Sequence, residues 1–144
     1  MNAEIKNVTP IELINRAKQA MEKAYCPYSG YKVGAALLTK DGQIFTGCNI
    51  ENASFTPTVC AERTAFFKAI SEGNTEFSAI AIVGGKDGVI SGIFPPCGVC
   101  RQVMSEFCDP EDFKVYLGTE TDEYKSLTLA GLLPYGFSKD NVSI

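Results

Sequence analysis

The order of helical and β-rich segments along the chain most constrains its fold. Two short β-rich runs, residues 32–39 and 43–50, are separated by Lys40-Asp41-Gly42, and Asp-Gly is a strong turn signal. They predict a hairpin, so part of the sheet must be antiparallel. Beyond the hairpin, helical patterns alternate with single apolar runs. The order α, β, β, α, β, α, β predicts a three-layer α/β/α sandwich, in which helices cover both faces of a mixed, roughly five-stranded sheet.

Local signals place the individual elements. A first helix is expected to begin at Thr9-Pro10-Ile11-Glu12, where a hydroxyl, a proline and a glutamate form a helix-start pattern, and to continue to about Ala24. Further helices are expected over 60–70, from Cys97 to about Cys108 and over 127–133, and strands over 79–83, over 114–118 and near Tyr124. Gly84-Gly85 is expected to follow the end of the buried strand.

The composition fits one ordinary globular domain over residues 1–144. Apolar residues make up 45% and charged residues 21% of the chain, which excludes disorder and coiled coil as descriptions of the whole. Thirteen basic against seventeen acidic residues give a net charge of −4, which disfavours a nucleic-acid partner. With no secretory signal visible and no apolar run near the ~20 residues that span a membrane, we expect a cytoplasmic protein with reduced thiols and no membrane partner.

The chain contains no histidine. Catalytic systems that pair serine or cysteine with histidine are therefore excluded, as are metals bound by imidazole. Any chemistry must depend on carboxylates, on thiols or on a metal held by thiolates.

Three cysteines occur in two motifs, Cys60-Ala61-Glu62 and Pro96-Cys97-Gly98-Val99-Cys100, each at an expected helix start. The positive end of a helix stabilises a thiolate and so favours metal binding. Cys97 and Cys100 can reach one ion, and Cys60 would complete a set of three ligands. Three protein ligands leave one tetrahedral position for water, which is typical of a catalytic zinc site. Thiolate ligands and a hydrolytic task favour zinc over iron.

The two residues after Ala61 suit roles beside this metal. Glu62 could take a proton from zinc-bound water and return it to a nitrogen of the substrate. A zinc ion with three thiolates carries a net negative charge, which makes it a poor Lewis acid. We therefore expect Arg63 to donate hydrogen bonds to the thiolates and so withdraw charge from the zinc.

Other interpretations of the cysteines remain open at this point. Cys108 could join the other three in a structural four-cysteine zinc module that binds a partner through its surface, and Cys97 and Cys100 could form a redox pair. Cys26, Cys48 and Cys108 are expected to be small buried apolar residues.

The motifs as a group resemble the small, homotetrameric cytidine deaminases that bind zinc through three cysteines. The matching segments span most of the chain: Pro27-Tyr28-Ser29, Val33-Gly34-Ala35-Ala36, residues 47–54, Cys60-Ala61-Glu62-Arg63, Pro96-Cys97-Gly98-Val99-Cys100-Arg101-Gln102, Leu132-Leu133-Pro134 and Phe137-Ser138. The segment around Asn49 and the Leu-Leu-Pro ending distinguish this family from other zinc deaminases.

The resemblance implies hydrolytic deamination of cytidine and 2′-deoxycytidine to uridine and 2′-deoxyuridine, a reaction of pyrimidine salvage that releases ammonia. One Zn²⁺ per subunit would be held by Cys60, Cys97 and Cys100, and zinc hydroxide would attack carbon 4 while Glu62 transfers protons. The resemblance further implies substrate contacts by Asn49 and Glu51 to the ribose 3′-hydroxyl, by the Ala61 N–H to the base carbonyl, by Tyr31 in the base pocket and by Phe137 over the base of a neighbouring subunit. A carboxylate at Glu51 would repel a phosphate, which favours a free nucleoside.

Two positions depart from the family's pattern. Tyr31 stands where a phenylalanine usually lines the base pocket, and Phe55 stands where a tyrosine often approaches from another subunit. Tyr31 could equally be an ordinary core aromatic with a solvated hydroxyl. The main rival function is a related deaminase of a modified cytosine, such as blasticidin S deaminase. A polynucleotide editor is a third possibility, but the sequence lacks the basic surface that it needs.

Overall fold

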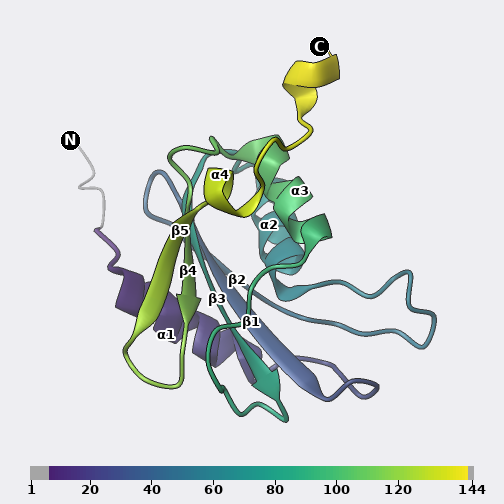
Figure 1. Cartoon of the computed structure of the whole chain (residues 1–144). Helices are drawn as coiled ribbons and strands as arrows, with labels where there is room; N and C mark the ends of the chain where they lie inside the picture. The colour runs from purple at the N-terminus through teal and green to yellow at the C-terminus, as the bar shows by residue number, and fades with distance from the viewer. Residues whose placement is uncertain (1–6, 143–144) are drawn as a thin grey trace.

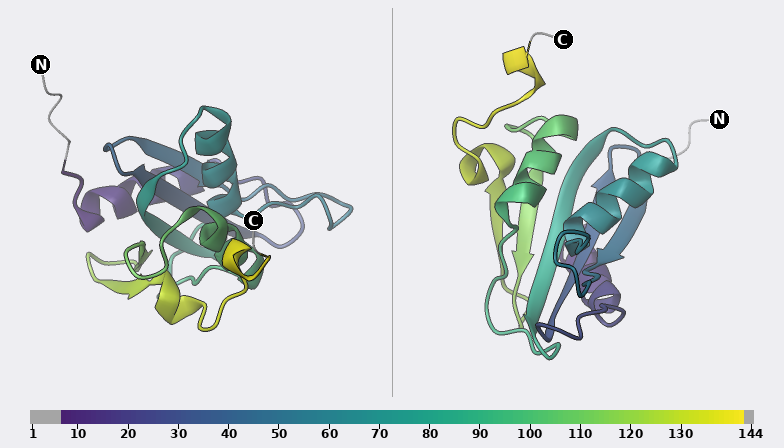
Figure 2. Two further views of the ribbon diagram at one scale, coloured as in Figure 1. Left: turned by 90° about the horizontal axis from the view of Figure 1, so that it is seen from above. Right: turned by 90° about the vertical axis from the view of Figure 1, so that its right-hand side faces the viewer.

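The structure, a computed structural model, describes residues 7–142 and contains a five-stranded mixed sheet with helices on both faces (Figures 1 and 2). The elements in chain order are α1 (Pro10–Met21), β1 (Tyr31–Thr39), β2 (Ile44–Cys48), α2 (Ala61–Ser71), β3 (Phe77–Lys86), α3 (Gly98–Phe107), β4 (Lys114–Gly118), β5 (Tyr124–Thr128), α4 (Leu129–Leu132) and a final 3₁₀ turn (Lys139–Val142). The strand order is β2-β1-β3-β4-β5, in which only the β3–β4 pair is parallel. The predicted fold class and the hairpin are confirmed.

One face of the sheet is covered by α1. This helix begins with a capping box, because the Thr9 hydroxyl accepts from the Glu12 N–H and the Glu12 carboxylate accepts from the Thr9 N–H. Its apolar stripe packs on small residues of β1 and β3; the buried members are Leu13, Ile14, Ala17, Met21, Ala36, Ala79, Ala81 and Val83. The helix ends at Met21, three residues before the expected Ala24.

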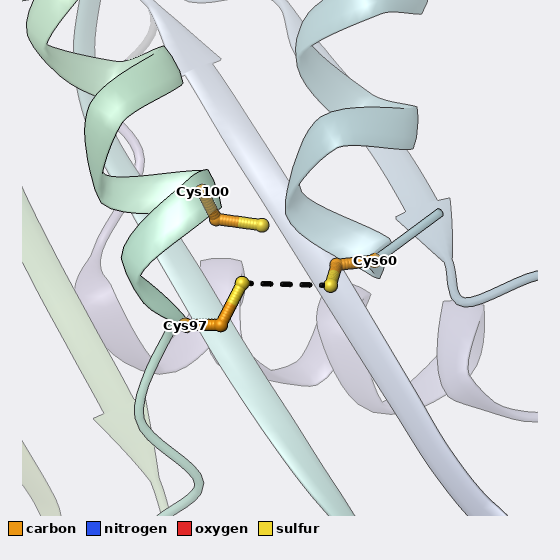
Figure 3. A group of neighbouring side chains, drawn as sticks. All are labelled: Cys60, Cys97 and Cys100. Carbon is orange, nitrogen blue, oxygen red and sulfur yellow. Dashed lines mark hydrogen bonds between the residues drawn. The ribbon is translucent and has the colours of Figure 1, made fainter. Parts of the chain in front are cut away.

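The opposite face carries the larger core, covered by α2, α3 and α4. Phe66 of α2 lies at its centre, with its ring 5.0 Å from that of Phe77 and 6.2 Å from that of Phe113. Met104 and Cys100 of α3 pack into the same core. This face therefore holds α2 and α3 side by side, both starting at the same end of the sheet (Figure 3).

Glycines allow the helices on both faces to approach the sheet closely. A Cβ at Gly34 in β1 would lie 2.0 Å from the Ala17 carbonyl oxygen of α1, and one at Gly47 in β2 would lie 2.4 Å from the Ala61 carbonyl oxygen of α2. Real Cβ atoms essentially never come within 3.0 Å of such atoms. The Gly47 contact lies at the first turn of α2, so it fixes the position of the helix start that carries Cys60.

Other boundaries also differ from the sequence prediction. β3 does not end before Gly84-Gly85 but continues to Lys86, because these residues pair with the start of β1. The two glycines leave room for Phe94 and the backbone of Val89 to pack closely over the strand. The expected helix over 127–133 is shorter, since Leu127 and Thr128 pair with β4 instead. In the part of the chain described, no helix is long and apolar enough to cross a membrane.

Candidate metal centre and active site

Two helix starts on the same face bring three cysteines together (Figure 3). Cys60 is the N-cap residue of α2, Cys97 is the N-cap residue of α3, and Cys100 lies in the first turn of α3. Their three Sγ atoms all lie within 4.8 Å of one another, and those of Cys60 and Cys97 are 3.7 Å apart. The predicted convergence of the two motifs is therefore present in the fold.

This geometry fits a tetrahedral zinc ion. Two sulfurs that are each about 2.3 Å from a tetrahedral ion lie about 3.8 Å apart, close to the Cys60–Cys97 separation. Within residues 7–142 the cluster contains only these three ligands. Cys108 is outside it, buried at the C-terminal end of α3, which contradicts a four-cysteine structural site. The donor set leaves one coordination position for water or substrate.

Neighbouring hydrogen-bond donors stabilise negative charge on the cysteine thiols. The Arg63 Nη2 donates to the Cys60 Sγ at 3.5 Å. A hydrogen bond from Cys100 lowers the pKa of Cys60, and the same contact raises the pKa of Cys100. Neither N-cap cysteine makes a side-chain capping bond, so the free N–H groups at both helix starts also face this charge. The Arg63 Nε is buried and has no hydrogen-bond partner within the described chain.

Glu62 lies beside the cluster as the second residue of α2. Its side chain is 3% exposed, an unusual state for a carboxyl group. Burial raises the pKa of Glu62 to about 7, and the negative charge at Cys60 contributes to the increase. A carboxyl group with such a pKa can both accept and release a proton near neutral pH.

A polar network joins the start of β1 to the segment after β2. The Asn49 side chain donates to the Tyr31 carbonyl at 2.7 Å and accepts from the Val33 N–H at 2.8 Å, which fixes its orientation. The Glu51 carboxylate accepts from the Tyr28 and Ser29 N–H groups and from the Ser29 hydroxyl. The hydroxyl bond lowers the pKa of Glu51, so this carboxylate stays ionised at neutral pH.

Tyr31 connects this network to the metal loop, the segment from Phe94 to Cys97 that precedes α3. Its ring is 46% exposed and lies 6.2 Å from that of Phe94, which precedes Cys97 by three residues. Such exposure excludes the interpretation of Tyr31 as a core residue of the single chain. Sequence reasoning missed Phe94, although its place directly before Pro95-Pro96-Cys97 was a usable signal.

Two aromatic residues expected near the substrate are exposed in the single chain. Phe55 is 81% exposed and lies in the loop between β2 and α2 that projects from the fold (Figure 1). Phe137 is 62% exposed and follows α4. Among the remaining cysteines, Cys108 is buried as expected, whereas Cys26 and Cys48 are only partly buried.

Comparisons with known proteins agree with this geometry. Residues 9–117 match the family model described as the cytidine and deoxycytidylate deaminase zinc-binding region. The chain is 50% identical to a cytidine deaminase of Sporosarcina psychrophila, over 92% of this chain and 93% of that protein. It is 51% identical to one of Halalkalibacterium halodurans, over 91% and 96% of the two chains. The crystal structure of a cytidine deaminase from Burkholderia pseudomallei superposes with a TM-score of 0.82 at 48% identity, covering 90% of this chain and all of that one.

Proposed function

Since this chain belongs to the cytidine and deoxycytidylate deaminase family, we infer that it is a zinc-dependent cytidine deaminase. It hydrolyses cytidine and 2′-deoxycytidine to uridine and 2′-deoxyuridine and releases ammonia, a reaction of pyrimidine salvage. The observation that carries this function is the three-thiol cluster beside a carboxyl group that is 3% exposed.

Cys60, Cys97 and Cys100 are the proposed zinc ligands. When bound, zinc acts as a Lewis acid that lowers the pKa of water and so provides the nucleophile for the hydrolysis. Arg63 withdraws charge from the Cys60 sulfur through its 3.5 Å hydrogen bond, which keeps a thiolate-rich site electrophilic. Arg63→Gln is expected to retain the fold but to weaken this effect.

Glu62 is the proposed proton carrier. Hydrolysis places the oxygen of water on carbon 4 of the base, and the departing amino group must gain a proton to leave as ammonia. Glu62 takes the proton that the attacking water loses and donates it to a nitrogen of the substrate. Its pKa, raised by burial to about 7, suits both steps.

The nucleoside is recognised on the side of β1 and β2. Asn49 and Glu51 are proposed to bind the ribose 3′-hydroxyl. Among residues 7–142, the Glu51 Oε2 accepts only from the Ser29 hydroxyl and so retains a lone pair. The Ala61 N–H, at the first position of α2, is proposed to donate to the base carbonyl. Tyr31 lines the base pocket together with Phe94.

We propose a homotetramer with active sites near the subunit contacts. The exposed aromatic rings of Phe55 and Phe137 support this, because large apolar side chains at such positions are typical of interfaces. Phe137 would cover the base bound by a neighbouring subunit. The ligand thiols must stay reduced, which favours the cytoplasm as the site of action.

The test is ammonia release from cytidine by the purified zinc-loaded protein, with Glu62→Gln as the matched control. This variant keeps the shape of the side chain but cannot carry the proton, so turnover should fall by roughly 10²–10⁴-fold while zinc content is retained. Blasticidin S is assayed in parallel, because a deaminase of modified cytosines shares the zinc motifs. No ammonia from cytidine, with release from blasticidin S, would overturn the proposed substrate.

A further inference from the structure

Two consecutive side chains of α3 reach the end of α4 and the segment that follows it. The Arg101 Nη1 donates to the Leu132 carbonyl at 2.6 Å, and the Gln102 Nε2 donates to the Phe137 carbonyl at 2.8 Å. Both residues follow directly after Cys100. The helix that supplies two of the three thiols therefore also holds the C-terminal segment, which passes beside it in Figures 1 and 2.

The Arg101 contacts join this segment to the loop that carries Cys97. The Leu132 carbonyl is at the C-terminal end of the four-residue helix α4, where carbonyl groups lack partners within the helix. The Arg101 Nε donates at the same time to the carbonyl of Pro96, the residue before Cys97, at 2.8 Å. One guanidinium group thus fixes the metal loop and the end of α4 relative to each other.

The Gln102 contact acts on Phe137 itself. Phe137 is 62% exposed, so packing against the described residues does not fix the position of its ring. The hydrogen bond from Gln102 to the Phe137 carbonyl fixes the backbone from which this ring projects. An exposed aromatic ring on an anchored backbone is suited to enter a site outside its own chain.

We propose that Gln102, supported by Arg101, is a positioning residue that presents the Phe137 ring to the substrate site of a second copy of this chain. The inference rests on the proposed function. It makes α3 serve two sites: the thiols serve the site of its own subunit, and Gln102 serves the aromatic wall of another.

The first test is a double-mutant cycle with Gln102→Glu and Phe137→Ala. Glutamate has the shape of glutamine but cannot donate to the carbonyl. We expect kcat/KM for cytidine to fall ~3–10-fold in Gln102→Glu, mainly through KM, and roughly 10–100-fold in Phe137→Ala. The double variant should match Phe137→Ala alone, since the positioning bond is useless without the ring. Gln102→Ala should behave like Gln102→Glu, and Glu106→Gln on the exposed side of α3 is the matched control.

If the fold-losses in kcat/KM of the two single variants multiply in the double variant, so that their free energies add, Gln102 acts independently of Phe137 and the proposal is overturned. So would an unchanged KM, or a KM change explained by lost zinc or a lowered melting temperature. If the parent releases no ammonia from cytidine, the proposed function fails; if the parent is active and the cycle is additive, only the positioning role fails.

The second test uses tetramers mixed from Gln102→Glu and Glu62→Gln chains. Sites with an intact Glu62 then belong to Gln102→Glu chains, but they can receive a well-held Phe137 from the other chain. KM should return toward the parental value in the mixture. A KM that stays raised would place Phe137 in the site of its own chain and refute presentation to a second copy.

Discussion

Gly47→Ala would test how the start of α2 is positioned. The alanine methyl group would lie 2.4 Å from the Ala61 carbonyl oxygen and 2.6 Å from the Ala65 nitrogen. Both atoms are backbone, so rotation of a side chain cannot relieve the clash. The first turn of α2 must move off β2, and this turn carries Glu62 and follows Cys60 directly.

The magnitude follows from these separations. An increase from 2.4 Å to at least 3.0 Å requires a movement of about 0.6 Å. Overpacking of this kind typically lowers the free energy of unfolding by ~1–3 kcal/mol. Displacement of reacting groups by ~1 Å can cost 10²-fold in rate, so we expect kcat to fall by roughly 10–100-fold. Zinc should also bind more weakly, because Cys60 is displaced relative to Cys97 and Cys100.

The assay combines chemical unfolding, zinc release to a chelator and ammonia release. Gly131→Ala is the control, since its new methyl group would lie 3.5 Å from the Thr128 hydroxyl oxygen, an ordinary contact. The control should keep its activity and its stability. If Gly47→Ala is as stable and active as the control, close contact with β2 does not position the metal-binding end of α2.

Two further predictions concern ionisable side chains. The pKa of Glu51 is lowered from 4.5, chiefly by the hydrogen bond from the Ser29 hydroxyl. Its carboxylate therefore stabilises the fold above pH 4.5, and this effect is lost as the pH falls through the lowered pKa. The melting temperature of Ser29→Ala should be below that of the parent at pH 7, and the difference should disappear in acid. Removal of zinc should expose Cys60 to alkylation at neutral pH, because its pKa is lowered, whereas Cys108, whose pKa burial raises to about 12, should stay unmodified in the folded protein. Peptide mapping by mass spectrometry checks this order, and early modification of Cys108 would contradict it.

The sequence predicted those parts of the fold that depend on local signals. The Asp-Gly turn and the Thr9 capping box act within a few residues, and both occur in the structure. The predicted end of β3 was wrong because the role of Gly84-Gly85 depends on Phe94 and Val89, which pack on the strand only in the folded chain. In a sequence, a pair of glycines predicts the end of a strand, but here the glycines allow close packing over a strand that continues.

The same distinction applies to the site. The three cysteines could be grouped from sequence because two helix starts and a Cys-x-x-Cys spacing limit where the thiols point. The contact between Gln102 and Phe137 spans 35 residues, and no periodicity links them. The exposure of the other cysteines could not be predicted either. Cys26 and Cys48 are only partly buried, and nothing in the neighbouring sequence indicates it.

The three longer helices explain how a chain without histidine can hold a catalytic zinc. The first, α1, is capped by the Thr9 side chain, whereas α2 and α3 have cysteine at the N-cap and no side-chain capping bond. Loss of a cap costs about 1 kcal/mol per helix, so both metal-binding helices are left less stable than they could be. In exchange, their free N–H groups and Arg63 surround the thiolates with positive charge, which a set of neutral imidazole ligands would not require. Metal binding and the stability of both helix starts are therefore coupled, and zinc removal should loosen the starts of α2 and α3 before it affects α1 on the opposite face.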